Sequence, residues 1–406
     1  MVNVDPPRLI RSSRSPAKLF TSMVVLLLAT GLGSAIAQTL PNIRTTFVPR
    51  LPAPNDCYQF SCFGPPSYDG STLGAIGALE PVVHVYRRIP AGPWYAQAIL
   101  RNRSVLPPGY TSAGYRAPIA VVGDDIVVTA FQYGPNVPEI CQTHVLGRND
   151  TRWSVKQVID RCADSLAKDG NRVLIDTVSQ FTIYVRGSDG LFTEESRILP
   201  PSDGFFAGER SLALHAWTVA VGKPAENSET GAAYIFQRRN GQWALAETLL
   251  PEAGGANTRF GHSVGVYEYN VAVSAPGAVP PSGVGRGMVY MYTGLDDDWL
   301  MSQQIGEPNA VEYPMGNVFG TALGFRGRRL IVSTYSSFVT SNGPPSYLFE
   351  RGVREAAWVA RATLAGDAQK IDLFGNTAML DRRDVRAGSH PTVVVLPALR
   401  EPDVAP

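Results

Sequence analysis

An internal repeat constrains the fold of this chain more than any other feature. Three stretches align without gaps, and each begins with Phe-Gly: FGHSVGVYEYNVAVSAPG at 260–277, FGTALGFRGRRLIVSTYS at 319–336 and FGNTAMLDRRDVRAGSHP at 374–391. A weaker copy covers 207–224. Each full copy has a polar break that predicts a hairpin turn, at Glu268, Arg326 and Arg382. Alternation with period two, rich in β-branched and aromatic residues, predicts strands and not helices.

A second unit recurs between these copies. It consists of an alternating strand such as VHVYRR at 83–88, then a turn, then an aromatic residue. The aromatic positions are Trp94, Trp153, Phe192, Trp243, Trp299 and Trp358. Five of the 6 tryptophans therefore share one repeat position, at intervals of about 40–60 residues. Such a period is typical of the four-stranded blades of a β-propeller.

The repeat predicts an all-β fold, a single β-propeller with seven blades of four antiparallel strands. The last strand, at 392–399, would join a degenerate N-terminal half blade that includes 73–81, so that both ends of the chain close the seventh blade. Six blades are the alternative, with the N-terminal stretch acting only as a cap. The 39 glycines and 32 prolines supply the many tight turns that such a fold needs.

The pattern FGxSVxV…VAVSAPG…GxVYxY…W resembles the FG-GAP repeats of integrin-alpha-type β-propellers and their bacterial secreted relatives. The resemblance is strongest over 206–391. It implies a closed propeller whose loops on one face contact ligands or partners. In many family members calcium binds a D-x-D-x-D-G loop, and no such loop follows a Phe-Gly unit in this chain. No cofactor is therefore predicted, and calcium is implied by the resemblance alone.

The N-terminus has the features of a secretory signal peptide. Basic residues precede an apolar run, and Ala35-Ile36-Ala37 provides a cleavage site before Gln38. The alternative is an uncleaved membrane anchor, because 19–37 is nearly long enough to span a bilayer. Cleavage predicts a secreted or periplasmic protein with no stable membrane insertion. The predicted organisation is a signal peptide at 1–37, an extension at 38–62, the propeller at 63–399 and a tail at 400–406.

All four cysteines follow the predicted leader. An even number of cysteines in an exported chain predicts disulfides, and three pairings are open on paper. Proximity in the sequence favours the pairs Cys57–Cys62 and Cys141–Cys162. A metal site or a catalytic thiol has less support, because the chain contains no C-x-x-C motif.

The charge balance argues against nucleic-acid binding. Basic and acidic residues number 36 and 35, so the chain lacks the basic excess that nucleic-acid binders carry. Two local arginine groups nevertheless occupy similar places in successive repeats: Arg326, Arg328, Arg329, Arg382, Arg383 and Arg386. If the repeats stay in register, these arginines predict an anion-binding surface. The alternative is solvated turn charges paired with Asp381 and Asp384.

No catalytic motif stands apart from the repeat. The string GHSVG at 261–265 matches a nucleophile elbow, but that elbow needs a strand-turn-helix context, and here the strand pattern continues. The acidic run at 296–298 is interpreted as a polar turn. The sequence therefore favours an exported, non-enzymatic binding module that uses loops on one propeller face to bind a protein or glycan partner. The alternative is a secreted hydrolase with a polar site at the propeller axis.

Overall fold

Strands make up nearly all of the regular structure, as the period-two alternation predicts. A computed structural model describes residues 46–47, 67–77, 80–89, 94–150, 152–177, 179–201, 205, 208–251, 255–283, 285–295, 298–308, 310, 318–335, 345–352, 357–364, 368–374, 377–384 and 388–396. All of them belong to one compact unit, Thr39–Pro406. The predicted signal peptide, the Cys57–Cys62 pair and Arg386 lie outside the described residues.

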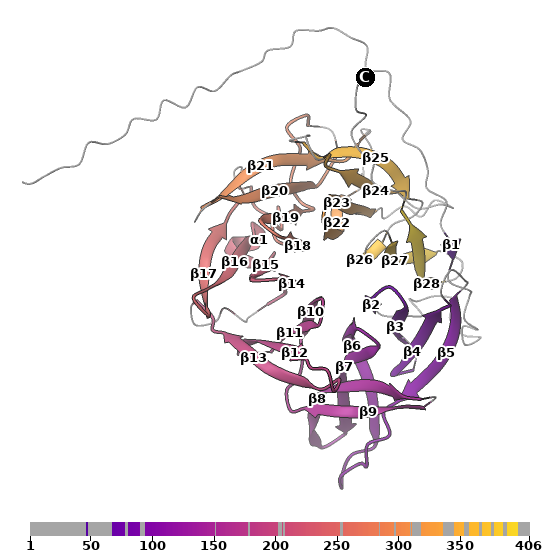
Figure 1. The fold of residues 1–406 in the computed structure, drawn as a ribbon. Helices are drawn as coiled ribbons and strands as arrows, with labels where there is room; N and C mark the ends of the chain where they lie inside the picture. Colours follow the sequence, from indigo (N-terminus) through magenta and orange to yellow (C-terminus); the bar gives the residue numbers. More distant parts are fainter. Residues whose placement is uncertain are drawn as a thin grey trace, which may run out of the picture. The chain divides into compact units, whose positions relative to one another are not determined.

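The described strands form seven four-stranded antiparallel sheets, which we number as blades 1 to 7 (Figure 1). Blade 1 contains β2 (Ser67–Tyr68), β3 (Thr72–Ile76), β4 (Val82–Arg88) and β5 (Trp94–Arg101). Blade 2 contains β6 (Ser112–Val122), β7 (Asp125–Gly134), β8 (Val137–Asn149) and β9 (Arg152–Ile159). Blade 3 contains β10 (Ser165–Asp169), β11 (Arg172–Asp176), β12 (Phe181–Arg186) and β13 (Phe192–Ile198). Blade 4 contains β14 (Ser211–His215), β15 (Thr218–Lys223), β16 (Ala232–Arg239) and β17 (Gln242–Leu249).

The remaining three blades follow the same plan. Blade 5 contains β18 (Val264–Tyr267), β19 (Asn270–Ala275), β20 (Met288–Leu295) and β21 (Asp298–Gly306). Blade 6 contains β22 (Val318–Arg326), β23 (Arg329–Tyr335), β24 (Ser346–Glu350) and β25 (Val359–Leu364). Blade 7 contains β26 (Ala368–Phe374), β27 (Thr377–Asp384), β28 (Gly388–Val395) and β1 (Thr46–Phe47).

The first strand of each blade lies innermost. Contacts run from β2 to β6, and then in turn through β10, β14, β18, β22 and β26, and β26 contacts β2 again. This order is that of a β-propeller with seven blades, so the predicted fold class is confirmed. The inner strands run into hairpins at one end of the ring, which we call the hairpin end. The opposite end, where the inner strands begin, is the entry end.

Blade 7 contains strands from both ends of the chain, but not in the predicted way. Its outermost strand is β1, in which Thr46 and Phe47 pair with Val393 and Thr392 of β28. The stretch 73–81, predicted to contribute half of the closing blade, instead supplies β3 to the complete blade 1. A two-residue strand has no periodicity to detect, and β1 lies inside the stretch predicted as an extension.

The repeated aromatics occupy equivalent core positions. Trp94, Trp153, Phe192, Trp243, Trp299 and Trp358 all lie at or beside the start of a fourth strand. Phe260 precedes β18 and packs against Tyr290 and Tyr292, and Phe319 of β22 packs in the same way against Tyr347 and Phe349. Such aromatic pairs contribute about 0.5–1.5 kcal/mol each beyond area burial. Two of the Phe-Gly units therefore perform one structural task in successive blades.

The third Phe-Gly stretch does not belong to that series. Phe374 is the last residue of the inner strand β26, whereas Phe319 lies at the start of β22. Arg382 pairs with Ala368 at the start of β26, so it lies within β27 and not at a hairpin break. The alignment of 374–391 with the other copies was therefore wrong by one strand length. The dipeptide Phe-Gly matches the other copies in sequence, but it does not lie at the equivalent place in its blade.

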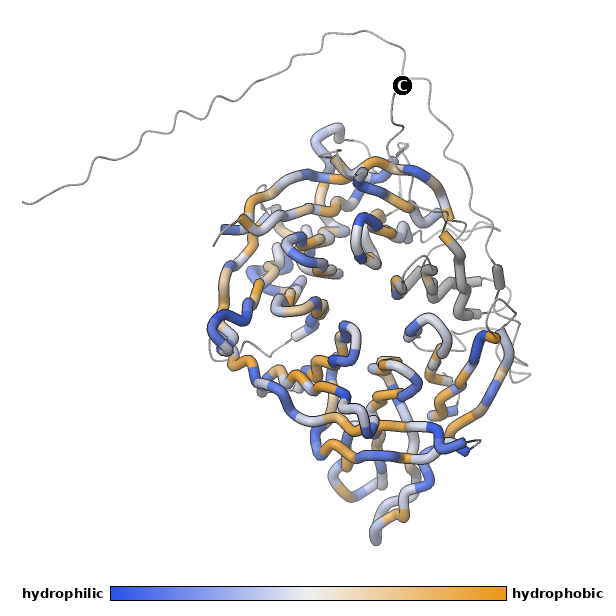
Figure 2. The backbone as a smooth tube through the Cα atoms, viewed as in Figure 1, coloured by the Kyte–Doolittle hydropathy of each residue, from blue (hydrophilic) through white to orange (hydrophobic). Residues whose placement is uncertain are grey.

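The second strands of blades 4 and 5 are buried along their whole length. All six residues of β15 and all six of β19 are buried. Neighbouring blades cover both faces of these strands, so strict alternation is lost and small β-branched residues are favoured. Figure 2 shows apolar segments running along the strands, with hydrophilic residues at many turns. The only helix among the described residues is α1 (Glu226–Glu229), and none of those residues forms a helix able to span a membrane.

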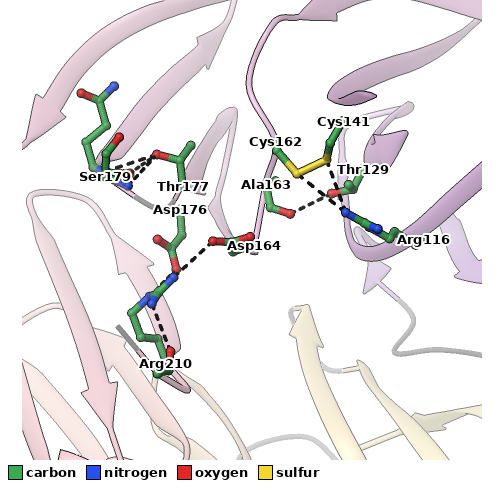
Figure 3. Close-up of polar contacts among 12 residues, drawn as sticks. Arg116, Thr129, Cys141, Cys162, Ala163, Asp164, Asp176, Thr177, Ser179 and Arg210 are labelled. Carbon is green, nitrogen blue, oxygen red and sulfur yellow. Dashed lines mark hydrogen bonds and ion pairs between the residues drawn. A yellow bond between two sulfur atoms is a disulfide. The ribbon is translucent and has the colours of Figure 1, made fainter. Parts of the chain in front are cut away.

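Several cross-links hold the entry end between blades 2 and 4. Cys141 and Cys162 form a disulfide, as predicted for that pair. Thr129 Oγ1 donates a hydrogen bond to the carbonyl oxygen of Ala163, 3.0 Å away. Arg210 pairs with the fully buried Asp176 at 2.9 Å (Figure 3). The connection into blade 3 is therefore fixed covalently and by buried polar contacts.

Candidate functional site

Six blades end their inner strands in two-residue hairpins of the same register, and the turn residues of five of them, in blades 2 to 6, are described. The closing pairs of those five hairpins are Val122–Asp125, Asp169–Arg172, His215–Thr218, Tyr267–Asn270 and Arg326–Arg329. Blades 2 to 6 therefore present the same backbone position repeatedly at the hairpin end. Differences among the side chains at these positions show where the surface is specialised.

The first turn residue has a positive φ in all five hairpins. It is glycine in three of them, Gly123, Gly170 and Gly327, but Ala216 (φ 48°) and Glu268 (φ 51°) take its place in blades 4 and 5. A non-glycine residue in the left-handed region costs about 1–2 kcal/mol. These two blades are also the ones whose second turn residue is aromatic, Trp217 and Tyr269. Strain and an aromatic side chain therefore occur together.

The side chain of Trp217 contacts two arginines and is otherwise exposed to solvent. The guanidinium carbons of Arg172 and Arg238 lie 4.3 and 5.1 Å from the centroid of its ring. Both arginines donate hydrogen bonds to Glu195, at distances from 2.8 to 3.1 Å. The indole nevertheless remains 49% exposed. A partly buried, hydrogen-bonded group of side chains thus orients a half-exposed tryptophan.

The backbone beside Trp217 is fixed as well. The Ala216 N–H donates a 2.8 Å hydrogen bond to Asp169 Oδ2, and the Trp217 carbonyl accepts one of 2.9 Å from the Arg238 N–H. In blade 5, the Tyr269 carbonyl accepts a 2.7 Å bond from the Gly294 N–H, and its side chain is 69% exposed. We call Trp217 and Tyr269 the aromatic pair. Both are displayed by hairpins that hydrogen bonds hold in place.

An axial cavity of about 480 Å³ lies beside these hairpins. Residues from all seven inner strands or their hairpins line it, and they include both apolar and polar residues. The charged or titratable residues among its lining are Asp69, Lys168, Asp169, His215, Tyr267, Arg326 and Asp372. A cavity of this volume, with apolar residues and several convergent polar groups, has the usual features of a ligand site.

A polar link crosses the cavity from blade 3 to blades 1 and 7. Lys168 Nζ lies 2.9 Å from Asp372 Oδ2 and also donates to the carbonyl oxygen of Tyr68. Asp372 Oδ2 accepts further hydrogen bonds from the Tyr68 N–H (3.1 Å) and from Ser67 Oγ (3.3 Å). We call this group the crossbar. It joins three blades across the axis.

Asp169 and His215 form a second polar pair at the cavity. His215 Nδ1 lies 3.3 Å from Asp169 Oδ2, and the imidazole stacks on Tyr267 with ring centroids 4.3 Å apart. Burial alone would raise the pKa of Asp169, but hydrogen bonds from His215 and Ala216, together with the charge of Arg326, lower it. Burial raises the pKa of Asp69 to about 6, although the Thr72 N–H and Lys168 oppose that shift.

The two predicted arginine groups are not brought together by the backbone. Arg326 and Arg329 close the hairpin of blade 6, whereas Arg382 and Arg383 lie in β27 near the entry end. Arg329 is buried and pairs with Glu350 at 3.1 Å. The expected crowding of both groups on one hairpin position is therefore absent, because it depended on the misaligned third Phe-Gly copy.

The other sequence candidates have structural roles. Ser263, in the string GHSVG, accepts a hydrogen bond from the Leu323 N–H and leads directly into the strand β18. Asp124 lies in a turn, and its neighbour Asp125 is buried and pairs with Lys156 and Arg186. Asp298 begins β21, and the other two aspartates of that run lie outside the described residues. Within the described ranges, no three His, Cys, Asp or Glu side chains are grouped to hold a metal ion.

Sequence reasoning missed the aromatic pair and the axial residues. One signal was available, because Trp217 is the single tryptophan outside the shared repeat position. Asp169, His215 and Asp372 carried no such signal. They lie in three different blades, and only the circular arrangement of the blades brings them together.

Comparisons with known proteins return structural neighbours only. The sequence matches no family model, and no curated protein matches it. Among solved structures, a chain of an S. cerevisiae Dbp5 complex with Nup159 and Gle1 has a TM-score of 0.44 and 10% identity, over 88% of this chain and 97% of that one. The N-terminal domain of Nup159 gives 0.43 and 12%, over 88% and 99%. Hsv2 of Kluyveromyces marxianus gives 0.39 and 8%, over 80% and 88%.

Proposed function

We propose that the protein is a non-enzymatic binding module that recognises a protein or glycan partner with its hairpin end. The observation that carries this proposal is the aromatic pair, Trp217 and Tyr269, on adjacent hairpins. Tryptophan, tyrosine and arginine are the residues that dominate binding energy at protein interfaces. Here a half-exposed tryptophan rests on two arginines that are themselves fixed by Glu195.

Preorganisation favours binding over a merely structural role for this surface. Holding Ala216 and Glu268 at positive φ costs free energy that glycine would avoid. Exposing two large aromatic rings to water adds nothing to the core. A backbone that fixes the rings lowers the conformational entropy that this surface loses when a partner docks, because the rings are already in place. A surface selected for stability alone would resemble the glycine hairpin of blade 3.

We further propose that the chain is exported and related to FG-GAP propellers. The basic and apolar leader at 1–37 supports export, and the Cys141–Cys162 disulfide suits an oxidising compartment. The equivalent packing of Phe260 and Phe319 supports the relationship. Localising the protein in cell fractions, with N-terminal sequencing for cleavage before Gln38, tests the export proposal.

The binding proposal is tested by a partner screen with the protein starting at Gln38. Wild-type protein is immobilised beside a Trp217→Ala/Tyr269→Ala variant and used to probe both a glycan array and a native extract. A Tyr133→Ala variant is the matched control, because Tyr133 is 51% exposed but lies near the entry end. We expect a saturable partner that the control retains and the double variant loses. Equal retention by all three proteins would contradict a binding role for the hairpin end.

The secreted hydrolase is the second candidate, and one observation favours it. Asp169 orients His215 through Nδ1, and within the described part of the chain His215 Nε2 makes no hydrogen bond. A carboxylate-oriented imidazole with a free nitrogen is the arrangement of a general base. Screening ester, glycoside and phosphoester substrates with wild type and His215→Asn tests this candidate. Turnover abolished by His215→Asn would favour the enzyme.

A further inference from the structure

We infer that the axial cavity is a binding site for one organic cation, a primary ammonium or a guanidinium group. This inference concerns the cavity and does not depend on the aromatic pair outside it. The shared chemistry is a single positive charge on a short aliphatic stem. Such a group could belong to a free small amine or to a lysine or arginine side chain of a partner protein.

The charges that line the cavity do not balance. Three carboxylates, Asp69, Asp169 and Asp372, face two fixed cations, Lys168 and Arg326. Asp372 is neutralised by Lys168 in the crossbar, and Asp169 lies close enough to Arg326 for its titration to respond to that charge. One negative charge is left over in the cavity. An unbalanced charge that is partly shielded from water is unfavourable, and a ligand of opposite sign lowers that cost.

Asp69 is the carboxylate that remains without a dedicated cation. Its Oδ1 accepts a 3.1 Å hydrogen bond from the Thr72 N–H, and Lys168 acts on it only at longer range. The neighbouring Asp124 is also negative, but it is paired with Arg87 at 3.1 Å. The cavity therefore has its excess negative charge near the hairpins of blades 1 and 2.

An aromatic wall stands on the side of blades 4 to 6. His215 and Tyr267 stack with an interplanar angle of 24°, and Phe325 meets Tyr267 at 6.5 Å between ring centroids. All three residues line the cavity. Aromatic faces attract organic cations through their ring quadrupole, and the attraction is stronger where the contact is shielded from water. Carboxylates and an aromatic wall together favour an organic cation over an anion.

The form of the cavity agrees with a small ligand. The crossbar spans the axis between blades 3, 1 and 7. A volume of about 480 Å³ accepts a short amine or one long side chain, but not a folded segment. The described residues contain no grouping suited to a metal ion, so an organic cation fits the cavity better than an inorganic one.

Calorimetric titration tests the inference with four isosteric probes: butylammonium, butylguanidinium, butyrate and butanol. We expect the two cations to bind in the millimolar range and butyrate not to bind. Asp69→Asn keeps the acceptor for Thr72 but removes the charge, and should weaken butylammonium binding at least tenfold. Tyr267→Leu should weaken it to a similar extent. The matched control is Asp160→Asn, an exposed carboxylate near the entry end, which should change nothing.

The pH dependence gives a second and independent readout. Asp69 is protonated below a pKa of about 6, so the excess negative charge disappears in acid. The charged groups that act on Asp69 are Lys168 and Asp124. Cation binding should therefore tighten as the pH rises from 5 to 7.5, and the tightening should be smaller in Asp69→Asn. Binding of butyrate, or equal cation affinity at both pH values, would overturn the inference.

Two further experiments distinguish a free small amine from a side chain of a partner protein. Mass spectrometry of small molecules released from protein purified from its own cells detects an amine if the ligand is free. Nα-acetyl-lysine methylamide binding at least tenfold more tightly than butylammonium indicates a partner's side chain instead. Neither arm requires the partner of the hairpin end. Loss of partner binding in the Trp217 variant with intact butylammonium binding would separate the two sites.

Discussion

The entry end and the hairpin end of the propeller differ in the roles of their side chains. At the entry end, Asp176 and Arg210 form a buried pair, and a disulfide fixes the connection into blade 3. At the hairpin end, one backbone position recurs in five blades, but its side chains vary from acidic Asp124 to aromatic Trp217. The entry end is built for stability, whereas the hairpin end presents variable groups on a constant frame. This contrast makes separable predictions for stability and for binding.

The largest stability effect is expected from the buried pair at the entry end. Arg210→Met leaves Asp176 buried without its cation, which should lower the free energy of unfolding by about 3–5 kcal/mol. Burial already raises the pKa of Asp176 to about 6, against the lowering by Arg210. A carboxyl whose pKa is raised by folding destabilises the fold as the pH climbs through that value. Urea unfolding should therefore show a greater loss at pH 8 than at pH 5.

A second variant distinguishes a charge effect from a packing effect at this pair. Arg210→Met combined with Asp176→Asn removes the buried charge and should recover part of the lost stability. The recovered free energy of unfolding should be greatest at pH 8, where Arg210→Met loses the most stability. A double variant no more stable than Arg210→Met would show that Asp176 matters for its shape and hydrogen bonds and not for its charge.

The disulfide should contribute the next largest stabilisation. Cys141 and Cys162 are separated by 21 residues, and closing a loop of that length stabilises a fold by about 3 kcal/mol in the chain-entropy account. Cys141→Ser/Cys162→Ser should lower the midpoint of thermal unfolding while leaving partner binding at the hairpin end unchanged. Loss of binding in the folded double variant would contradict the separation of the two ends.

Binding should follow the opposite pattern at the hairpin end. Trp217→Ala should weaken binding of the partner found in the screen by about thirtyfold, a loss of about 2 kcal/mol. Its effect on unfolding should stay below about 1 kcal/mol, because only the contact of the ring with Arg172 and Arg238 is lost. Asn171→Ala, at the equivalent turn position of blade 3, is the matched control and should change the affinity by less than threefold. Surface plasmon resonance measures both variants.

The sequence predicted the blades better than the site, for a physical reason. Core residues such as Phe260 and Trp299 repeat because every blade needs them, so their period reveals the architecture. The prediction for blade 7 was wrong because Phe374 matches the Phe-Gly repeat in sequence but ends strand β26 instead of starting a strand. The axial residues have no period at all, since each blade contributes a different group. Trp217 stood out in the sequence only because it is the one tryptophan outside the shared repeat position.

The hairpins of blades 3 and 4 allow a matched pair of opposite substitutions. Gly170 has φ 57° and open space where a Cβ would lie, so Gly170→Ala adds strain without a clash. It should lower the free energy of unfolding by about 0.5–1 kcal/mol, because the left-handed strain exceeds the entropy gained by losing glycine. Chemical denaturation with both variants measured side by side detects a difference of this size.

Ala216→Gly is the reverse change and the smallest effect expected. It should raise the free energy of unfolding by about 0.5–1 kcal/mol, because φ 48° suits glycine better than alanine. The same change should weaken partner binding by a few-fold, since a freer backbone at position 216 holds Trp217 less firmly. Opposite signs for stability and binding would show that alanine is retained to position the ring. If binding were unchanged, the strain at Ala216 would have no role in recognition, and blades 3 and 4 would differ only in their exposed side chains.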